Sequence, residues 1–312
     1  MIDLVICGPE MSGTGTQVAD TIEWLRGRGK TVRDMRGTEV EALFHAKRFR
    51  ALNENYVNLR DFVHDDKVLH TDKLYFFQDA TRLLSFGETN RDLKVASMVL
   101  NEVSTFVDPD SADAWIFEEP TKRGAGQVNR ATEQNRSRYS STMDPIAAAY
   151  CHQTYRVDEY LRFRRVLREA GKFIVRSRSE ESACYQIRDE YHLPHGIDRN
   201  AYLALPGHKL AFGNPPTCIF VVCGPADWTA EGYNELRAKR TAGRYLDDYE
   251  QNTDYILLVN RRYASAWLEE LYEEACALYG SKPPVIHRFD INLPKDALRE
   301  AMQRKLAENV DV

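Results

Sequence analysis

The strongest constraint on the fold is an apolar segment that runs into a glycine-rich turn and then into a helical pattern. Residues 2–7 are mostly apolar, and residues 8–17 read Gly-Pro-Glu-Met-Ser-Gly-Thr-Gly-Thr-Gln. The residues after them place Val18, Ile22 and Leu25 on one helical face. A buried strand, a glycine-rich turn and a helix in this order typically open a parallel sheet, with the turn directed at an anion.

The rest of the chain alternates predicted strands with predicted helices. Further strands are expected at residues 31–35, 114–117, 172–175, 218–223 and 285–289. A long helix is expected over residues 144–170, and a last helix begins after Pro294. This alternation predicts a doubly wound parallel α/β sheet, whose ligand site lies at the carboxyl ends of the strands.

Residues 37–112 interrupt this alternation. Apolar side chains recur there at helical spacing, notably over residues 40–52 and 93–106, and no low-complexity linker separates the segment from the rest. We therefore expect a mostly helical insertion packed on a single domain that spans residues 1–312.

Composition narrows the classes of function. The chain of 312 residues has a net charge of −5 and no apolar run near the roughly 20 residues that span a bilayer. The negative charge disfavours general nucleic-acid binding, because contacts with phosphates need an excess of basic surface. The six cysteines form no Cys-x-x-Cys pair and are interpreted as small buried hydrophobes in a reducing compartment. The sequence thus predicts a cytoplasmic protein that binds neither nucleic acid nor a membrane.

Several degenerate motifs follow one another in a recognisable order. Residues 8–17 resemble a motif that consists of a glycine, an acid and then Ser-Gly-Lys-Thr-Thr-Gln. They differ from it in having Thr14 at the position of the lysine and Gly15 at the position of the following threonine. The later motifs are Glu119-Pro120-Thr121 with Gly124 and Gly126; Arg156, a helix ending at Gly171, and Arg178; Ser182, Tyr185 and Gln186; and Arg237, Arg240, Arg244, Asp248, Tyr249, Glu250 and Tyr263. Together they resemble the thymidylate kinases, with a degenerate Walker A loop, over the chain outside residues 37–112.

This resemblance carries expectations about fold and activity. It implies the P-loop nucleotide kinase fold with a five-stranded sheet, so one of the six predicted strands is expected to be wrong. It also implies ATP-dependent phosphoryl transfer to a nucleoside monophosphate, with ATP and Mg²⁺ as cofactors, in a homodimer.

The phosphate loop is expected to consist of Gly8, Ser12, Gly13, Thr14, Gly15 and Thr16. A P-loop holds phosphates with backbone N–H groups, a lysine and a magnesium-binding hydroxyl. Here Thr14 brings no positive charge and Gly15 offers no hydroxyl; Thr16 lies one residue late and is a possible Mg²⁺ ligand only if the loop is re-registered. The glycines, Ser12 and the helix N-terminus still favour anion binding, although a tight turn that binds nothing would have the same pattern.

Three arginines are expected to replace the missing charge. Arg237, Arg240 and Arg244 lie in a lid-like segment, residues 232–250, and the resemblance implies a catalytic role for them. A lid arginine can stabilise the transferred phosphoryl group in the way an arginine finger does. Basic residues three and four apart also occur on solvated helix faces, and that interpretation stays open.

The resemblance assigns the acceptor site to Glu10, Arg156, Arg178, Tyr185 and Gln186. Arg178 corresponds to the arginine on the acceptor phosphate, Glu10 to an acid near the sugar, and Arg156 to the base-contacting arginine. In the alternative, Arg156 pairs with Glu159 along its helix.

Neighbouring positions modify this expected site. Ser177 stands where the family has an aspartate near the metal, and Arg176 is expected to join Arg178 in a grip on phosphate. Glu118 stands where the family often has an arginine on the acceptor phosphate.

Two alternatives to the kinase remain. Thr14, Gly15 and Ser177 all stand where the family has residues that take part in the reaction, whereas the acceptor residues persist. The main alternative is therefore a non-catalytic nucleotide-binding relative that has lost the ATP site. A P-loop enzyme of altered chemistry is the other, with the insertion supplying His45, His64 and His70.

Overall fold

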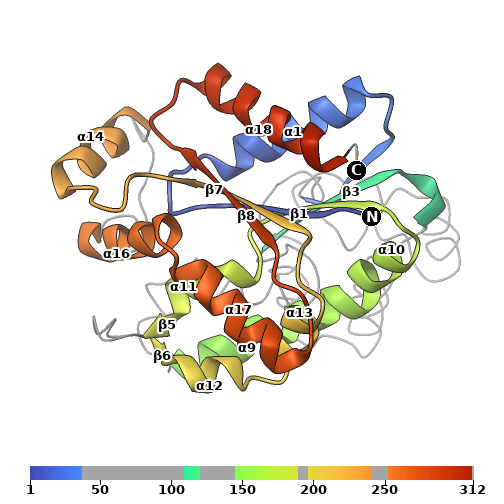
Figure 1. Cartoon of the computed structure of the whole chain (residues 1–312), viewed down its shortest axis with the longest axis horizontal. Coiled ribbons are helices and arrows are strands. Elements are labelled where there is room, and N and C mark those ends of the chain that lie inside the picture. Colours follow the sequence, from blue (N-terminus) through green and yellow to red (C-terminus); the bar gives the residue numbers. More distant parts are fainter. Residues whose placement is uncertain (37–108, 120–144, 189–195, 241–251, 311–312) are drawn as a thin grey trace, which may run out of the picture.

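A six-stranded, wholly parallel sheet forms the centre of the molecule (Figure 1). The computed structural model describes residues 1–36, 109–119, 145–188, 196–240 and 252–310. Within them the strands are β1 (Asp3–Cys7), β2 (Val32–Asp34), β3 (Ala114–Glu118), β4 (Phe173–Ser177), β7 (Cys218–Cys223) and β8 (Val285–Asp290), in the spatial order β2-β3-β4-β1-β7-β8. A separate parallel pair joins β5 (Ile187–Arg188) to β6 (Ile197–Asp198).

All six predicted strands are present, so the expectation of five strands is wrong. The short strand β2 forms because Thr31 and Asp113 fix it against β3. The Thr31 N–H donates to the Asp113 carboxylate at 2.8 Å, and the Asp113 N–H donates to the Thr31 hydroxyl at 3.0 Å. At the other end, β8 pairs with β7 from Val285 to Asp290. Both additions lie at the ends of the sheet, where a strand needs one partner only.

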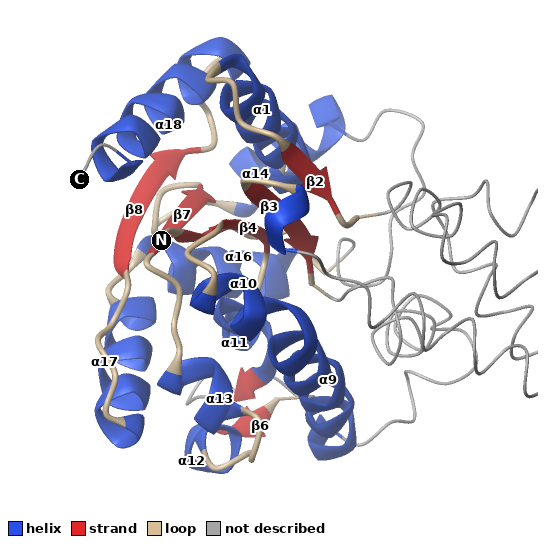
Figure 2. Ribbon diagram, turned by 90° about the vertical axis from the view of Figure 1, so that its right-hand side faces the viewer, coloured by secondary structure: helices blue, strands red, loops and turns tan. Residues whose placement is uncertain are grey.

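Helices cover both faces of the sheet (Figures 1 and 2). On one face lie α1 (Thr14–Gly27) and α18 (Lys295–Val310). The opposite face carries α9 (Pro145–Glu159), α10 (Arg165–Glu169), α11 (Ala183–Gln186), α12 (Arg199–Leu203), α13 (His208–Gly213), α16 (Thr253–Ala264) and α17 (Trp267–Tyr279). Helix α14 (Ala230–Arg240) follows β7, and the short turns η1 (Pro109–Ser111) and η3 (Glu180–Ser182) complete the described elements.

The central strand β1 is buried on both faces, as its apolar sequence predicts. Leu4 and Ile6 pack in the cluster that contains α1 and α18, and Val5 and Cys7 pack in the cluster that contains α16 and α17. Successive side chains of a strand point to opposite faces, so β1 can only lie inside a three-layer α/β/α structure.

The long helix predicted over residues 144–170 is present with one irregularity. Between α9 and α10 it contains a π-helical turn, η2 (Tyr160–Arg164), and it ends before Gly171, whose φ of 71° only glycine adopts readily. The last helix also begins where expected, directly after Pro294. The positions of both helices were therefore correctly predicted.

Some predictions fall outside the described residues. Residues 37–108 of the predicted insertion are among them, as are Gly124, Gly126 and Arg244. All six cysteines are free, and five of them are buried as predicted, with Cys151 half-buried. Among the described helices none is long and apolar enough to cross a membrane.

Candidate functional site

The turn after β1 is held tightly against the neighbouring strand. A Cβ added to Gly8 would lie 2.1 Å from the carbonyl oxygen of Val222 in β7, so only glycine fits there. The turn folds back where the Ser12 N–H donates to the Pro9 carbonyl at 3.1 Å. Met11 and Gly13 adopt left-handed backbone angles, with φ of 67° and 77°. This geometry leads directly into the first turn of α1.

The first turn of α1 exposes unpaired donors. The backbone N–H groups of Gly13, Thr14, Gly15 and Thr16 donate to no residue in the described ranges. Such N–H groups lack intrahelical partners and carry the positive end of the helix dipole. The hydroxyl of the neighbouring Ser12, a residue that is 2% exposed, also makes no hydrogen bond within the described part of the chain. The predicted loop residues therefore form a set of donors suited to an anion.

These donors border a pocket of about 540 Å³. Its lining consists of residues 9–17, Arg178 and Arg240, and Leu293, Lys295 and Leu298. Three cationic side chains and one carboxylate, that of Glu10, are in this lining. The pocket lies at the carboxyl end of the parallel strands, as the sequence predicted.

Arg178 joins the predicted acceptor residues to the phosphate loop. Its guanidinium pairs with the Glu10 carboxylate at 2.7 Å and lies 5.3 Å from the centre of the Tyr185 ring. The Tyr185 hydroxyl in turn donates to the Gly8 carbonyl at 3.2 Å. Burial alone would lower the pKa of Arg178, but the Glu10 charge outweighs it and holds that pKa well above its usual range. Arg178 is therefore a fixed positive charge at the pocket wall.

The lid arginines have different environments. Arg240 donates to the Met11 carbonyl of the loop and, at 3.0 Å, to the Ile291 carbonyl after β8. Partial burial lowers its pKa. Arg237 lies over the Tyr233 ring of its own helix, 5.7 Å from the ring centre, and is not part of the pocket lining. Of the two lid arginines in the described residues, the structure thus brings only Arg240 to the phosphate loop.

The predicted acceptor residues Arg156 and Gln186 are not part of the pocket lining. Arg156 is buried and donates to the Glu119 carboxylate through Nε at 3.0 Å and to the Tyr202 hydroxyl at 3.3 Å. Its partner is thus the glutamate of the Glu119-Pro120-Thr121 motif. Gln186 is half-buried, and its Oε1 accepts no hydrogen bond from the described residues.

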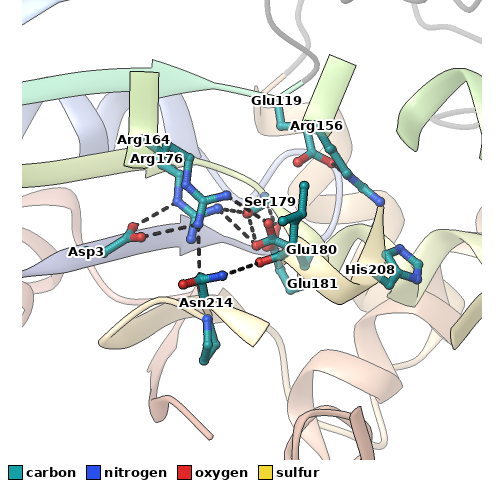
Figure 3. A network of polar contacts seen from close by, with 12 residues as sticks. Asp3, Glu119, Arg156, Arg164, Arg176, Ser179, Glu180, Glu181, His208 and Asn214 are labelled. Atoms are coloured by element: carbon teal, nitrogen blue, oxygen red, sulfur yellow. Dashed lines mark hydrogen bonds and ion pairs between the residues drawn. The ribbon is translucent and has the colours of Figure 1, made fainter. Parts of the chain in front are cut away.

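A buried ionic network lies under the sheet, next to these residues (Figure 3). Arg176 donates to Asp3 at 2.9 Å and to Glu180 at 2.9 Å. Arg164 donates to the same two carboxylates, at 3.3 and 3.0 Å. Both acids have lowered pKa values because these arginines outweigh the cost of burial. The expectation that Arg176 joins Arg178 is wrong, because the Arg176 side chain points into this network.

Two titratable groups beside the network are held neutral near pH 7. Burial, and then the nearby Glu119 charge, raises the pKa of Glu181 to about 8. Burial, and then the Arg156 charge, lowers the pKa of His208 to about 3. The His208 Nδ1–H donates to the Tyr202 carbonyl at 2.6 Å, which leaves Nε2 to accept from Gln153 at 2.6 Å.

The sequence interpretation missed two features of the site. Lys295, the first residue of α18, lines the pocket. A second Cys-Gly-Pro turn, at residues 223–225, repeats the one at residues 7–9 on the adjacent strand β7. Asn260 holds this second turn by accepting from the Gly224 N–H at 2.8 Å and donating to the Pro225 carbonyl at 2.9 Å. Both features follow predicted strands, so the carboxyl-edge rule could have drawn attention to them.

No group of three His, Cys, Asp or Glu side chains within the described ranges is placed to hold a metal ion. Magnesium at phosphates usually needs only one or two protein ligands, with phosphate oxygens and waters as the rest. The Thr16 hydroxyl, which lines the pocket, fits that limited requirement.

Comparison of the sequence with models of known protein families gives no match, and comparison with curated proteins gives no match either.

Proposed function

We propose that the protein is an ATP-dependent nucleoside monophosphate kinase of the P-loop fold, similar to the thymidylate kinases, with a divergent phosphate loop. One observation carries this proposal: loop residues 9–17, Arg178 and Arg240 border a single pocket at the carboxyl end of a parallel sheet. Phosphoryl transfer depends mainly on positioning and on neutralising charge, and this pocket offers groups for both.

On the donor side, the free N–H groups of residues 13–16 would bind the phosphates of ATP. The Ser12 hydroxyl adds one more donor at the base of the loop. Mg²⁺ would neutralise phosphate charge, and the Thr16 hydroxyl is the group that would hold it.

On the acceptor side, Arg178 would hold the phosphate of the nucleoside monophosphate. The phosphate must then replace Glu10, which leaves this carboxylate free to accept hydrogen bonds from the acceptor sugar. Because Glu10 belongs to the phosphate loop and Arg178 follows β4, this exchange would couple acceptor binding to the donor loop.

A specific observation also supports the non-catalytic alternative. Arg240, the lid arginine nearest the loop, donates to two backbone carbonyls and so acts as a clamp between Met11 and Ile291. If it never leaves these carbonyls, the pocket would bind a nucleotide without turning it over.

The test is to incubate the protein with Mg-ATP and each common ribo- and deoxyribonucleoside monophosphate, and to quantify ADP and diphosphate products. One diphosphate product is expected. Arg240→Ala should slow its formation by at least about tenfold, because a charge-assisted hydrogen bond is lost. Arg165→Ala is the matched control, since Arg165 is half-exposed on α10 and pairs only weakly with Glu169 at 3.9 Å.

Absence of turnover with every acceptor, combined with a thermal shift from a monophosphate but none from Mg-ATP, would overturn the kinase and support the non-catalytic relative.

The resemblance also leads us to propose a homodimer, which light scattering of the purified protein would test.

A further inference from the structure

The two helices on the same face of the sheet bring their N-termini to the same pocket. Helix α1 follows β1 and α18 follows β8, and because all strands are parallel, both helices begin at the carboxyl edge. The two helices lie side by side (Figure 1), and Val18 and Ile22 of α1 belong to the same buried cluster as Leu298 and Met302 of α18. Lys295 thus lines the same pocket as the free N–H groups of the phosphate loop.

The three cations of the pocket differ in what holds them. Arg178 is paired with Glu10, and Arg240 donates to two backbone carbonyls. Lys295 makes no hydrogen bond or ion pair with any residue that the structure describes. Its neighbour Asp296 pairs with Arg299 at 2.9 Å instead. An anion entering the pocket would therefore find one positive charge that no protein group has to release.

Lys295 is at a position where its positive charge does not stabilise α18. A cation at the first residue of a helix is repelled by the positive end of the helix dipole, which is stabilised by acids. Asp296 meets that preference in α18, and Lys295 opposes it. A bound phosphate would remove the conflict, because it would be attracted by Lys295 and by both helix N-termini.

A second observation points to a ligand at this place. Ser12 is 2% exposed and lines the pocket, yet its hydroxyl makes no hydrogen bond within the described part of the chain. The side chain is almost fully enclosed but borders the pocket, so a polar ligand there can pair with this hydroxyl.

We propose that Lys295 supplies, from α18, the phosphate-binding positive charge that Thr14 does not supply from the phosphate loop. The inference rests on the proposed function in one respect, that the pocket receives the polyphosphate of a nucleotide. It assigns this charge to a residue of α18, the helix that follows the last strand of the sheet, and not to the phosphate loop or the lid-like segment.

The test is isothermal titration calorimetry with pyrophosphate and with Mg-ATP. Lys295→Ala should weaken the binding of both probes by roughly tenfold or more, as expected for a lost charge-assisted hydrogen bond. Lys295→Arg should keep most of the affinity. Lys305→Ala is the matched control: it removes the same charge from the same helix, where Lys305 pairs with Glu308, and should leave both affinities unchanged.

A rescue variant separates phosphate binding from a structural role. Thr14→Lys in the Lys295→Ala background returns a charge to the pocket from the loop, and should recover binding of pyrophosphate. Wild-type affinity in Lys295→Ala, or loss for Mg-ATP but not for pyrophosphate, would overturn the assignment, since the lysine would then not act on phosphate. If the wild type itself binds neither probe, the proposed function fails as well, which distinguishes the two failures.

Discussion

Arg176 and Arg178 stand two residues apart, yet they belong to two different regions of the molecule. Arg176 lies in the buried network, where Asp3 and Glu180 oppose its charge on both sides. Arg178 lies at the wall of the pocket, where a partly exposed Glu10 is its acidic partner. In the network the charged side chains form ion pairs with one another, whereas the pocket contains charged groups and hydrogen-bond donors that a ligand can reach.

The difference arises from the backbone. Arg176 is still in β4, so its side chain follows the alternation of the strand toward the α9–α17 face. Arg178 comes after the strand and has a φ of 67°, which breaks the alternation and turns its side chain toward the phosphate loop. A left-handed residue directly after a strand can therefore separate a structural arginine from a ligand-facing one.

The largest effect is expected from breaking the buried network. Arg176→Ala removes one of the two arginines that the buried carboxylates of Asp3 and Glu180 share, and should lower the free energy of unfolding by about 3–5 kcal/mol. Urea denaturation followed by circular dichroism measures this. The exposed Arg165→Ala should stay within about 0.5 kcal/mol of the wild type. A similarly small change for Arg176→Ala would show that the network does not stabilise the fold.

Arg178→Ala should do the opposite, with a large effect on turnover and a small one on stability. Under the proposed function, in which Arg178 binds the acceptor phosphate, losing its charge should reduce kcat/KM by roughly 100-fold. The partly exposed pair with Glu10 is worth at most about 1 kcal/mol of stability. Parallel turnover and denaturation measurements on this variant and on Arg176→Ala would sharpen the contrast. Equal losses of stability in the two variants would remove it.

A further, pH-dependent effect concerns Glu181, at the margin of the network. Its pKa of about 8 in the folded state lies above the ordinary 4.5 of the unfolded chain, so the folded protein holds an extra proton between these values. This group's contribution is therefore fully present below pH 4.5 and is lost as the pH rises toward 8, by about 1.4 kcal/mol per pH unit.

Glu181→Gln keeps an oxygen to accept from the Ser179 N–H and removes the titration. Relative to the wild type, its stability should rise between pH 5 and pH 8, measured by denaturation at several pH values. Comparing the two proteins cancels the opposite contribution of His208, which has a lowered pKa. If the free energies of unfolding of the two proteins instead changed in parallel with pH, Glu181 would be ionised in the folded protein.

The sequence was sufficient for elements with a strong local pattern. Each predicted strand is present, and the free donors of residues 13–16 lie where a strand, a glycine-rich turn and a helix place them. The number of strands was misjudged because the resemblance was preferred over the apolar pattern. At β2 that pattern was correct, since Thr31 and Asp113 fix the strand through hydrogen bonds that no periodicity reveals.

Side-chain partners were harder to predict, because they depend on packing between distant segments. Arg156 was expected at a ligand or on Glu159, and it is paired with Glu119, which follows another strand. Lys295 follows a predicted strand, but only the packing of α18 on α1 brings it to the loop. Such long-range contacts are not encoded in the local spacing of residues.

The pocket's two walls come from widely separated parts of the chain, residues 9–17 and residues 293–298. Among the described strands, β8 is at the end of the sheet and pairs with β7 alone, so local unfolding of β8 and α18 breaks the hydrogen bonds of a single strand pair. A ligand that contacts both walls binds only the folded arrangement and must disfavour this local unfolding. The amide hydrogens of α18 should therefore exchange more slowly with solvent when the phosphate loop, at the opposite end of the sequence, is occupied.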